Sequence, residues 1–436
     1  MIRKKFGSYI SSLKTEGAGL FKKGLFHIFG GSLLVKIIGF ADVTLLIRIL
    51  SKTEYGQWGY ARNIFQIVLL FAAFGAPAGI LQFCARAKTH SEKIAFWKFG
   101  FFWGLKANLL LALVMILLSL FVPFPILGSN PILLGLSLLP TLMILFDSQT
   151  IFLRATFRNK EFAGASLFNS ALFLGFTVSG ALTFGVTGVI AGRYIAMLFS
   201  VGLGFKMLKK EWKEFWGSRK LGSSQRKAFL SFSVVAMLST SISSLLYKID
   251  TFLVGTLSES AEIVASYQTA TLIPFNLNFI PLALMTFAYP YFAQKSHNQN
   301  WIRKNLKKLI MRLGVLNGAI SGLLFIFAPH IINILFGSQY ADSVIPFRIL
   351  AVGYFFAGTF RIPLGNVIAA MGKIKVNFWF SLGTGIMNIF LDYWFIQKWG
   401  AIGAAWATLI VFLISSWAGI GFFLFWFHRK SGSPPN

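Results

Sequence analysis

Twelve ionisable side chains lie inside long apolar stretches of the sequence, where a charge is costly and therefore usually functional. Eight are cations and four are anions: Lys36, Arg48, Arg62, Lys106, Arg193, Lys248, Arg348 and Arg361, with Asp42, Asp147, Asp250 and Asp392. A purely structural network of charges would tend towards balance. The surplus of cations instead predicts a wet cavity that receives an anion, and guanidinium and ammonium groups suit phosphate oxygens.

Six of these cations are candidates for lining the cavity: Lys36, Arg48, Arg62, Arg193, Lys248 and Arg361. Lys36 and Arg361 lie deepest in their apolar stretches and are the strongest candidates. Pro363 follows Arg361 and can open backbone groups inside a span. The four acids are either counter-ions of these cations or ion-coupling sites, and the sequence favours neither role.

One cavity cannot receive every charge on the first apolar stretch. On a straight helix, 100° per residue places Lys36, Asp42 and Arg48 on three different faces. Either the helix unwinds near Gly39, or Arg48 reaches the headgroups from its position near the end. For Arg48, Arg62, Lys106 and Arg348, a position without a role in binding is at least as consistent with the sequence.

The composition identifies the elements that must position these charges as membrane-spanning helices. Of the 436 residues, 56% are hydrophobic and only 12% are charged, against about 25% in an average soluble chain. A net charge of +28 would suggest nucleic acid in a soluble chain, but the apolar stretches exclude that interpretation. A span needs about 20 mostly apolar residues, which predicts twelve spans: 24–50, 57–83, 99–122, 130–153, 162–184, 186–206, 229–255, 263–293, 309–336, 344–370, 376–397 and 400–427.

Basic residues are distributed very unevenly between the two sets of connecting segments. With the N-terminus inside, the inner segments hold 31 Lys and Arg, whereas the outer turns hold only Lys52 and Lys398. This asymmetry predicts cytoplasmic termini. Residues 1–23 are expected to form a basic amphipathic segment on the inner leaflet, with a basic cytoplasmic linker over 207–228 and a cytoplasmic tail over 428–436.

The linker divides the spans into an N-lobe over 24–206 and a C-lobe over 229–427, with six helices each. The two lobes share residues at a common offset of 215 positions: Gly185 with Gly400, Gly188 with Gly403, Arg158 with Lys373, and Lys160 with Lys375. Repeats in the same orientation imply a pseudo-two-fold axis along the membrane normal, with a substrate between the halves. Glycine pairs that only mark close helix packing are the alternative.

The motifs of several reaction classes are absent from the sequence. There is no GxxxxGK[ST] phosphate loop, no HExxH, no GxSxG and no cluster of Cys and His with metal-ligand spacing. No metal or cofactor is expected. All predicted outer loops are shorter than about ten residues, which argues against a membrane-embedded polymerase or ligase with a large external domain.

Several segments follow one another in the order of a known family: LLIRILSKTEYGQWGYA, YKIDTFLVGTLSESAEIVASYQTA, LFGSQYADSVIPFRIL, AAMGKIKVNFWFSLGTGIMNIFLDYWFI and WGAIGAAWAT. Together they resemble the oligosaccharide (O-antigen type, Wzx-like) flippases of the polysaccharide-export family. This family belongs to the superfamily of multidrug-and-toxin extrusion (MATE) transporters. The resemblance covers nearly the whole chain and is not specific for a substrate.

The resemblance implies an all-α, MATE-like membrane protein that does no covalent chemistry. Its implied function is to move an undecaprenyl-diphosphate-linked oligosaccharide from the inner to the outer leaflet of the bacterial cytoplasmic membrane. Membrane lipids, a polysaccharide polymerase and a chain-length regulator are the further partners expected. A multidrug or cation antiporter of the same superfamily is the first alternative, although it would favour an acidic cavity. A glycan polymerase or ligase is the second.

Overall fold

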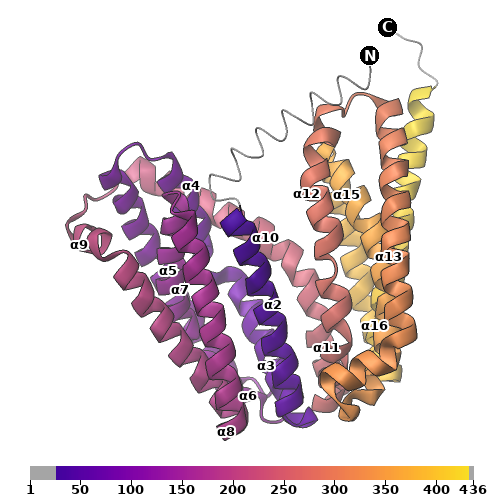
Figure 1. Ribbon diagram of the computed structural model, residues 1–436, viewed down its shortest axis with the longest axis horizontal. Helices are drawn as coiled ribbons and strands as arrows, with labels where there is room; N and C mark the ends of the chain where they lie inside the picture. Colours follow the sequence, from indigo (N-terminus) through magenta and orange to yellow (C-terminus); the bar gives the residue numbers. More distant parts are fainter. Residues whose placement is uncertain (1–25, 432–436) are drawn as a thin grey trace. The chain divides into compact units, whose positions relative to one another are not determined.

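The computed structural model describes residues 26–431, and this part of the chain is helical with no strand (Figure 1). The predicted segment 1–23 lies outside the described residues. The helices are α2 (Phe26–Ile49), α3 (Lys52–Val68), α4 (Ala76–Arg86), α5 (His90–Phe121), α6 (Ser129–Leu136), α7 (Leu139–Ala155), α8 (Asn159–Met207), α9 (Lys209–Gly217), α10 (Ser223–Ser258), α11 (Ala261–Asn276), α12 (Phe279–Gln294), α13 (Gln299–Phe336), α14 (Val344–Phe356), α15 (Ile362–Ala370) and α16 (Ile374–Ser431).

The helices confirm a polytopic membrane protein. Eight helical stretches of the described chain are long and apolar enough to cross a bilayer. Two of them, within α8 and α16, are 49 and 54 residues long, roughly twice what one crossing needs. Counting each of these twice and adding α2 and α10 gives the twelve predicted crossings.

The two long helices each reverse direction at a glycine. Gly185 has φ 56° and ψ −137°, and Gly400 has φ 52° and ψ −126°, a region that residues with a Cβ avoid. Beyond each turn the arms touch closely. An added Cβ on Gly188 would lie 1.9 Å from the carbonyl oxygen of Gly180, and one on Gly403 would lie 2.1 Å from that of Phe395. The same conformation 215 residues apart supports the internal repeat.

Several spans that the sequence predicts as single helices are broken. Between α3 and α4, a 3-10 segment over Leu69–Gly75 contains non-helical residues, including Ala73. The buried Asn108 on α5 accepts a hydrogen bond from the Ala73 N–H at 2.6 Å and donates one to the Pro140 carbonyl at 2.6 Å. One amide side chain thus satisfies backbone groups beside the breaks in the second and fourth spans, as a span without water requires.

Contacts within the chain group its residues into two lobes. The first lobe comprises residues 26–50, 64–123 and 128–245, and the second comprises 51–63, 124–127 and 246–431. The division differs from the predicted linker at 207–228 because α10 is continuous, and its first half packs within the first lobe through Phe229. α9 also packs there, with Trp212 and Phe215 buried.

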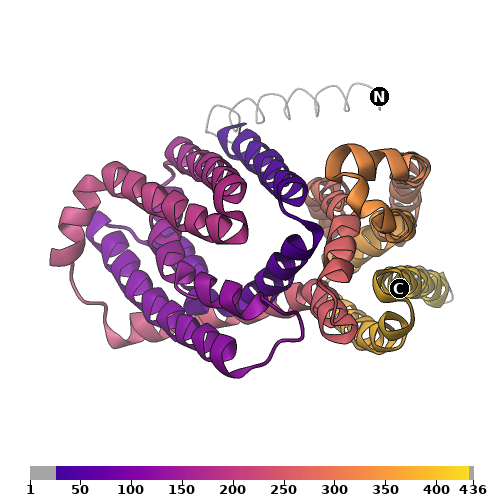
Figure 2. The same ribbon diagram turned by 90° about the horizontal axis from the view of Figure 1, so that it is seen from below.

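Each lobe brings particular helices side by side, seen roughly end-on in Figure 2. In the first lobe, α2 lies along α8. In the second, α14 packs between α13 and α16, and α11 packs against both α14 and α16. These neighbours determine which of the charges in the membrane can meet.

Candidate functional site

A polar cluster within the membrane-spanning part of the first lobe, which we call the Asp42 cluster, comprises Asp42, Thr177 and Arg193. Asp42 on α2 is only 8% exposed. The Thr177 hydroxyl donates a hydrogen bond to its Oδ1 atom, and Arg193 Nη2 lies 3.5 Å from its Oδ2 atom. Thr177 and Arg193 lie on opposite arms of the α8 hairpin, so the turn at Gly185 brings both to α2. Arg193, a predicted cavity cation, is therefore in an ion pair with a predicted counter-ion.

The second lobe holds a more acidic cluster, the Asp250 cluster (Asp250, Asp392, Asn388, Thr408 and Tyr267). Asp250 on α10 and Asp392 on α16 are 4% and 0% exposed, and their carboxyl groups are within hydrogen-bonding reach of each other. Thr408 and Tyr267 donate to Asp250 Oδ2 at 3.1 and 3.3 Å, and Asn388 donates to Asp392 Oδ2 at 2.8 Å. Two adjacent buried carboxylates cannot both remain charged unless a cation or proton compensates them.

The two clusters occupy corresponding positions of the internal repeat. An offset of 215 residues pairs Thr177 with Asp392 and Arg193 with Thr408. Asp42 and Asp250 lie in the first predicted span of each six-span half of the sequence, 24–50 and 229–255. A cation in the first lobe therefore corresponds to a hydroxyl in the second, and a hydroxyl in the first corresponds to an acid in the second.

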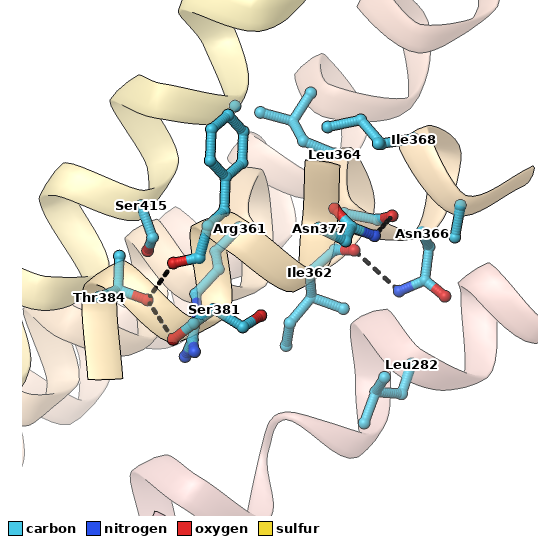
Figure 3. Close-up of a pocket in the computed structure, with 14 residues that line it drawn as sticks. Leu282, Arg361, Ile362, Leu364, Asn366, Ile368, Asn377, Ser381, Thr384 and Ser415 are labelled. Atoms are coloured by element: carbon cyan, nitrogen blue, oxygen red, sulfur yellow. Dashed lines mark hydrogen bonds between the residues drawn. The ribbon is translucent and has the colours of Figure 1, made fainter. Parts of the chain in front are cut away.

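Arg361 lines a polar cavity of about 300 Å³ within the second lobe (Figure 3). It ends a π-helical turn over Ala357–Arg361, two residues before Pro363, and its guanidinium lies 5.0 Å from the centre of the Phe412 ring. The remaining polar lining carries amides and hydroxyls: Asn366, Asn377, Ser381, Thr384 and Ser415. No acidic side chain is among the residues that line this cavity.

Arg361 also borders the Asp250 cluster. A second, much smaller cavity of about 20 Å³ is lined by Arg361 and Thr384 together with Asp250, Asn388 and Thr408. Arg361 therefore lines both the cavity with amides and hydroxyls and the small cavity that Asp250 lines. This position couples the two sites electrostatically, because any change of charge at the acids alters the field at Arg361.

Two further predicted cations lie together in the second lobe. Arg62 on α3 and Lys248 on α10 are half-buried and close enough to repel each other electrostatically. The Asn63 side chain fixes the two helices here by donating to the Lys248 carbonyl at 3.2 Å. Two like charges held side by side favour an anion between or beside them.

The remaining predicted residues join neither cluster. Lys36 and Arg48 are exposed on α2, whereas Asp42 between them is buried. Asp147 on α7 is half-buried. Arg348 lies over the Phe325 ring at 5.3 Å and donates to the Phe325 carbonyl at 3.0 Å, which is a structural role.

The sequence reasoning missed the neutral polar residues of these sites. Thr177, Asn388, Thr408, Asn377 and Thr384 carry no charge, so a search for ionisable groups passes over them. The offset of 215 residues would have found Thr177 and Thr408, because it aligns them with Asp392 and Arg193. Among the described residues no group of three or more His, Cys, Asp or Glu could hold a metal ion.

Comparison with known proteins identifies the family. The family described as "Polysaccharide biosynthesis protein" matches residues 45–345, which is well over half of the chain, and the chain belongs to this family. A Shigella flexneri protein named "Putative O-antigen transporter" is 26% identical over 237 residues. That match covers 53% of this chain and spans 54%, about half, of the relative's length.

Solved structures show the same fold at low sequence identity. An inward-facing multidrug resistance MATE family transporter of the MOP superfamily has a TM-score of 0.78 at 15% identity, over 92% of this chain and 96% of that one. The lipid II flippase MurJ in an inward closed conformation has a TM-score of 0.68 at 16% identity, over 94% and 93%. The fold is therefore MATE-like, as the sequence predicts.

Proposed function

We propose that this protein is a flippase that moves an undecaprenyl-diphosphate-linked oligosaccharide from the inner to the outer leaflet by alternating access. The observation that carries the proposal is the cavity at Arg361, which combines one cation with amides and hydroxyls and has no acid in its lining. Family membership supports a role in polysaccharide assembly. The fold, shared with MATE transporters and MurJ, supports transport without covalent chemistry.

The lining of the cavity suits the two polar parts of such a substrate. A guanidinium can bind two phosphate oxygens at once, which assigns the diphosphate to Arg361. Asn366, Asn377, Ser381 and Thr384 offer the amides and hydroxyls that bind sugar hydroxyl groups. Arg62 and Lys248 provide a second place for negative charge. The polyprenyl tail stays in the lipid, since these cavities have no room for it.

The Asp250 cluster is proposed as the coupling site for a monovalent cation or a proton. Its two carboxyl groups and the Thr408 hydroxyl supply oxygen atoms, and a proton or cation there would remove the charge conflict between the acids. Arg361 and Asp250 line the same small cavity. Loss of the bound cation or proton would therefore strengthen the electrostatic attraction between the acids and Arg361. The guanidinium would then hold the diphosphate less tightly. A negative-inside membrane potential also favours outward movement of an anion, by about 2.3 kcal/mol per charge per 100 mV.

The proposed location is the bacterial cytoplasmic membrane, with both termini inside. Basic segments that are distant in sequence meet at one end of the second lobe, where Arg303 lies over Phe427 and Lys373 lies over Phe422. At the other end, Lys52 pairs with Asp342 at 2.6 Å. This segregation is the pattern that the positive-inside rule describes. A polysaccharide polymerase and a chain-length regulator remain the proposed protein partners.

The two alternative functions fit the second lobe less well. A cation antiporter needs acids in its substrate cavity, whereas the acids here lie in a separate small pocket beside Arg361. A polymerase or ligase needs a large external loop. Within residues 26–431 the connections at the Lys52 end are short, for example residues 122–128 and 259–260.

The proposal is tested by transport in reconstituted liposomes with a fluorescently labelled undecaprenyl-diphosphate oligosaccharide in the inner-facing leaflet. Arg361→Ala removes the proposed diphosphate contact, and Lys36→Ala tests the other leading candidate. Arg348→Ala is the matched control, because it removes an arginine of the same predicted span that contacts Phe325 and does not line the cavity. A charged hydrogen bond is worth about 1.5–3 kcal/mol, so Arg361→Ala should slow transport about tenfold to a hundredfold.

Arg348→Ala should keep the wild-type rate. Equal rates for wild type, Arg361→Ala and Lys36→Ala would remove the cationic cavity from the account. Equal slowing by Arg348→Ala and Arg361→Ala would show that arginines of this span act through folding alone.

A further inference from the structure

A third cavity, larger than the substrate cavity at Arg361, lies on a different face of α15 from that cavity. It is a groove of about 470 Å³ between α13 and the end of α16, which is within the size range of ligand pockets, about 300–1,000 Å³. We call it the α13/α16 groove. Its walls are apolar, with Leu306, Ile310 and Met311 from α13, and Ile420, Phe423, Leu424 and Phe427 from α16.

The groove has a charged end and an apolar end. Arg303, Lys307 and His428 lie at its charged end, and no acid lines it. On α13, the residues 303, 306, 307, 310 and 311 recur at helical spacing, so cations and apolar side chains follow one another along one face. At the charged end, Gln299 donates to the carbonyls of Trp426 and Phe427 at 3.1 and 3.0 Å, which ties the two helices together.

Leu364 separates the groove from the substrate cavity, because this buried side chain lines both. An added Cβ on Gly419 would lie 3.0 Å from Leu364 Cδ1, so α15 and α16 are closely packed here. The two cavities therefore share a wall and differ in lining. The substrate cavity carries amides and hydroxyls, whereas the groove has none.

We propose that the α13/α16 groove binds an anionic phospholipid of the leaflet at the charged end of the lobe. The phosphate lies between Arg303 and Lys307, and an acyl chain lies along Ile310, Met311 and Ile420. Basic pockets between membrane helices are a known arrangement for anionic headgroups. A lipid with a small head fits, because the lining has none of the amides and hydroxyls that the substrate cavity carries. In this position the lipid would contact Leu364 and stabilise the wall of the substrate cavity.

The test measures lipids retained by the full-length protein in native mass spectrometry, with phosphatidylglycerol and phosphatidylcholine as probes. Arg303→Gln/Lys307→Gln removes the charged end. Lys304→Gln/Lys308→Gln is the matched control, because it removes two exposed lysines of the same helix that do not line the groove. At about 1 kcal/mol per basic residue, the first pair should weaken phosphatidylglycerol binding about thirtyfold.

A second pair of variants tests the apolar wall without changing charge. Met311→Trp fills the groove, whereas Val315→Trp adds the same ring one turn further along, at an exposed position outside the groove. Met311→Trp should displace the retained phosphatidylglycerol, and Val315→Trp should leave it bound.

The proposal requires the Arg303/Lys307 pair and Met311→Trp to lose phosphatidylglycerol while both controls keep it. It is overturned if the Arg303/Lys307 pair and the Lys304/Lys308 pair have equal effects, because positive charge would then attract the lipid without a defined site. It is also overturned if phosphatidylcholine is retained equally well. Binding of undecaprenyl phosphate in place of phosphatidylglycerol would instead assign the groove to the substrate's own lipid.

Discussion

The Asp42 and Asp250 clusters sit at corresponding places in the two lobes, yet they balance their charge differently. In the first lobe Arg193 lies 3.5 Å from Asp42, so a side chain of the protein itself supplies the compensating positive charge. In the second lobe the position of Arg193 is taken by Thr408 and that of Thr177 by Asp392, leaving two buried acids together. The same framework thus carries one fixed ion pair and one site that can gain or lose a charge.

This difference assigns the two lobes different tasks. A fixed pair holds α2 against both arms of the α8 hairpin whatever the ion conditions. In the proposed mechanism an acid pair would change its charge with the ions that reach it, and Arg361, which lines the same small cavity as Asp250, would transmit the change to the substrate cavity. The first lobe would then serve as the constant part of the transporter and the second as the responsive part.

The largest expected effect is a difference in protein stability between a substitution in the Asp42 cluster and one in the Asp250 cluster. Asp42→Asn should lower the free energy of unfolding by roughly 3 kcal/mol, because it leaves a poorly hydrated guanidinium without its carboxylate. Asp250→Asn should cost less than about 1 kcal/mol, because it relieves the conflict between two acids and keeps an acceptor oxygen for Thr408. Thermal unfolding in detergent measures both, and equal losses would contradict the assignment.

A second prediction concerns ion dependence. A ligand that binds only the folded protein raises its unfolding temperature as its concentration rises. The unfolding temperature of wild type should therefore rise with Na⁺ at fixed pH or with acidity at fixed Na⁺. Asp392→Asn should abolish this response, because the remaining acid has no charge conflict to relieve. Arg193→Gln, a change in the other cluster, should retain it, and a response unchanged in Asp392→Asn would rule out the second lobe as the sensor.

The smallest effect concerns a single hydroxyl group. Tyr267→Phe removes the hydrogen bond to Asp250 at 3.3 Å, and a net hydrogen bond of about 1 kcal/mol corresponds to about a fivefold change in ion affinity. Tyr194→Phe is the matched control, because its hydroxyl donates to the Gly135 carbonyl in the first lobe at 2.8 Å. The midpoint of the Na⁺ or pH titration should shift only for Tyr267→Phe.

The sequence predicted the parts of this structure that depend on hydropathy and on glycine. Spans follow from about 20 apolar residues each. The pair Gly185 and Gly400, which is a sign of the repeat in the sequence, lies at the two hairpin turns with positive φ. Charges at membrane depth identified Asp42, Arg193, Asp250, Asp392 and Arg361. These signals are local and therefore visible in a single chain.

The sequence did not predict features that depend on contacts between distant segments. The break at Ala73 exists because Asn108, 35 residues away, accepts its N–H. The ion pair of Arg193 with Asp42 could not be distinguished from a role in the cavity, because both need the same charge at the same depth. Neutral donors such as Asn388 became recognisable only once the structure placed them beside the acids.

The central claim is that Arg361 binds the diphosphate, and a structure of the protein with a bound undecaprenyl-diphosphate oligosaccharide tests it most directly. The account predicts phosphate oxygens at hydrogen-bonding distance from the Arg361 guanidinium, about 2.7–3.2 Å, with sugar hydroxyl groups near Asn377 and Thr384. A diphosphate bound elsewhere, with Arg361 directed at Asp250 and Asp392, would contradict it.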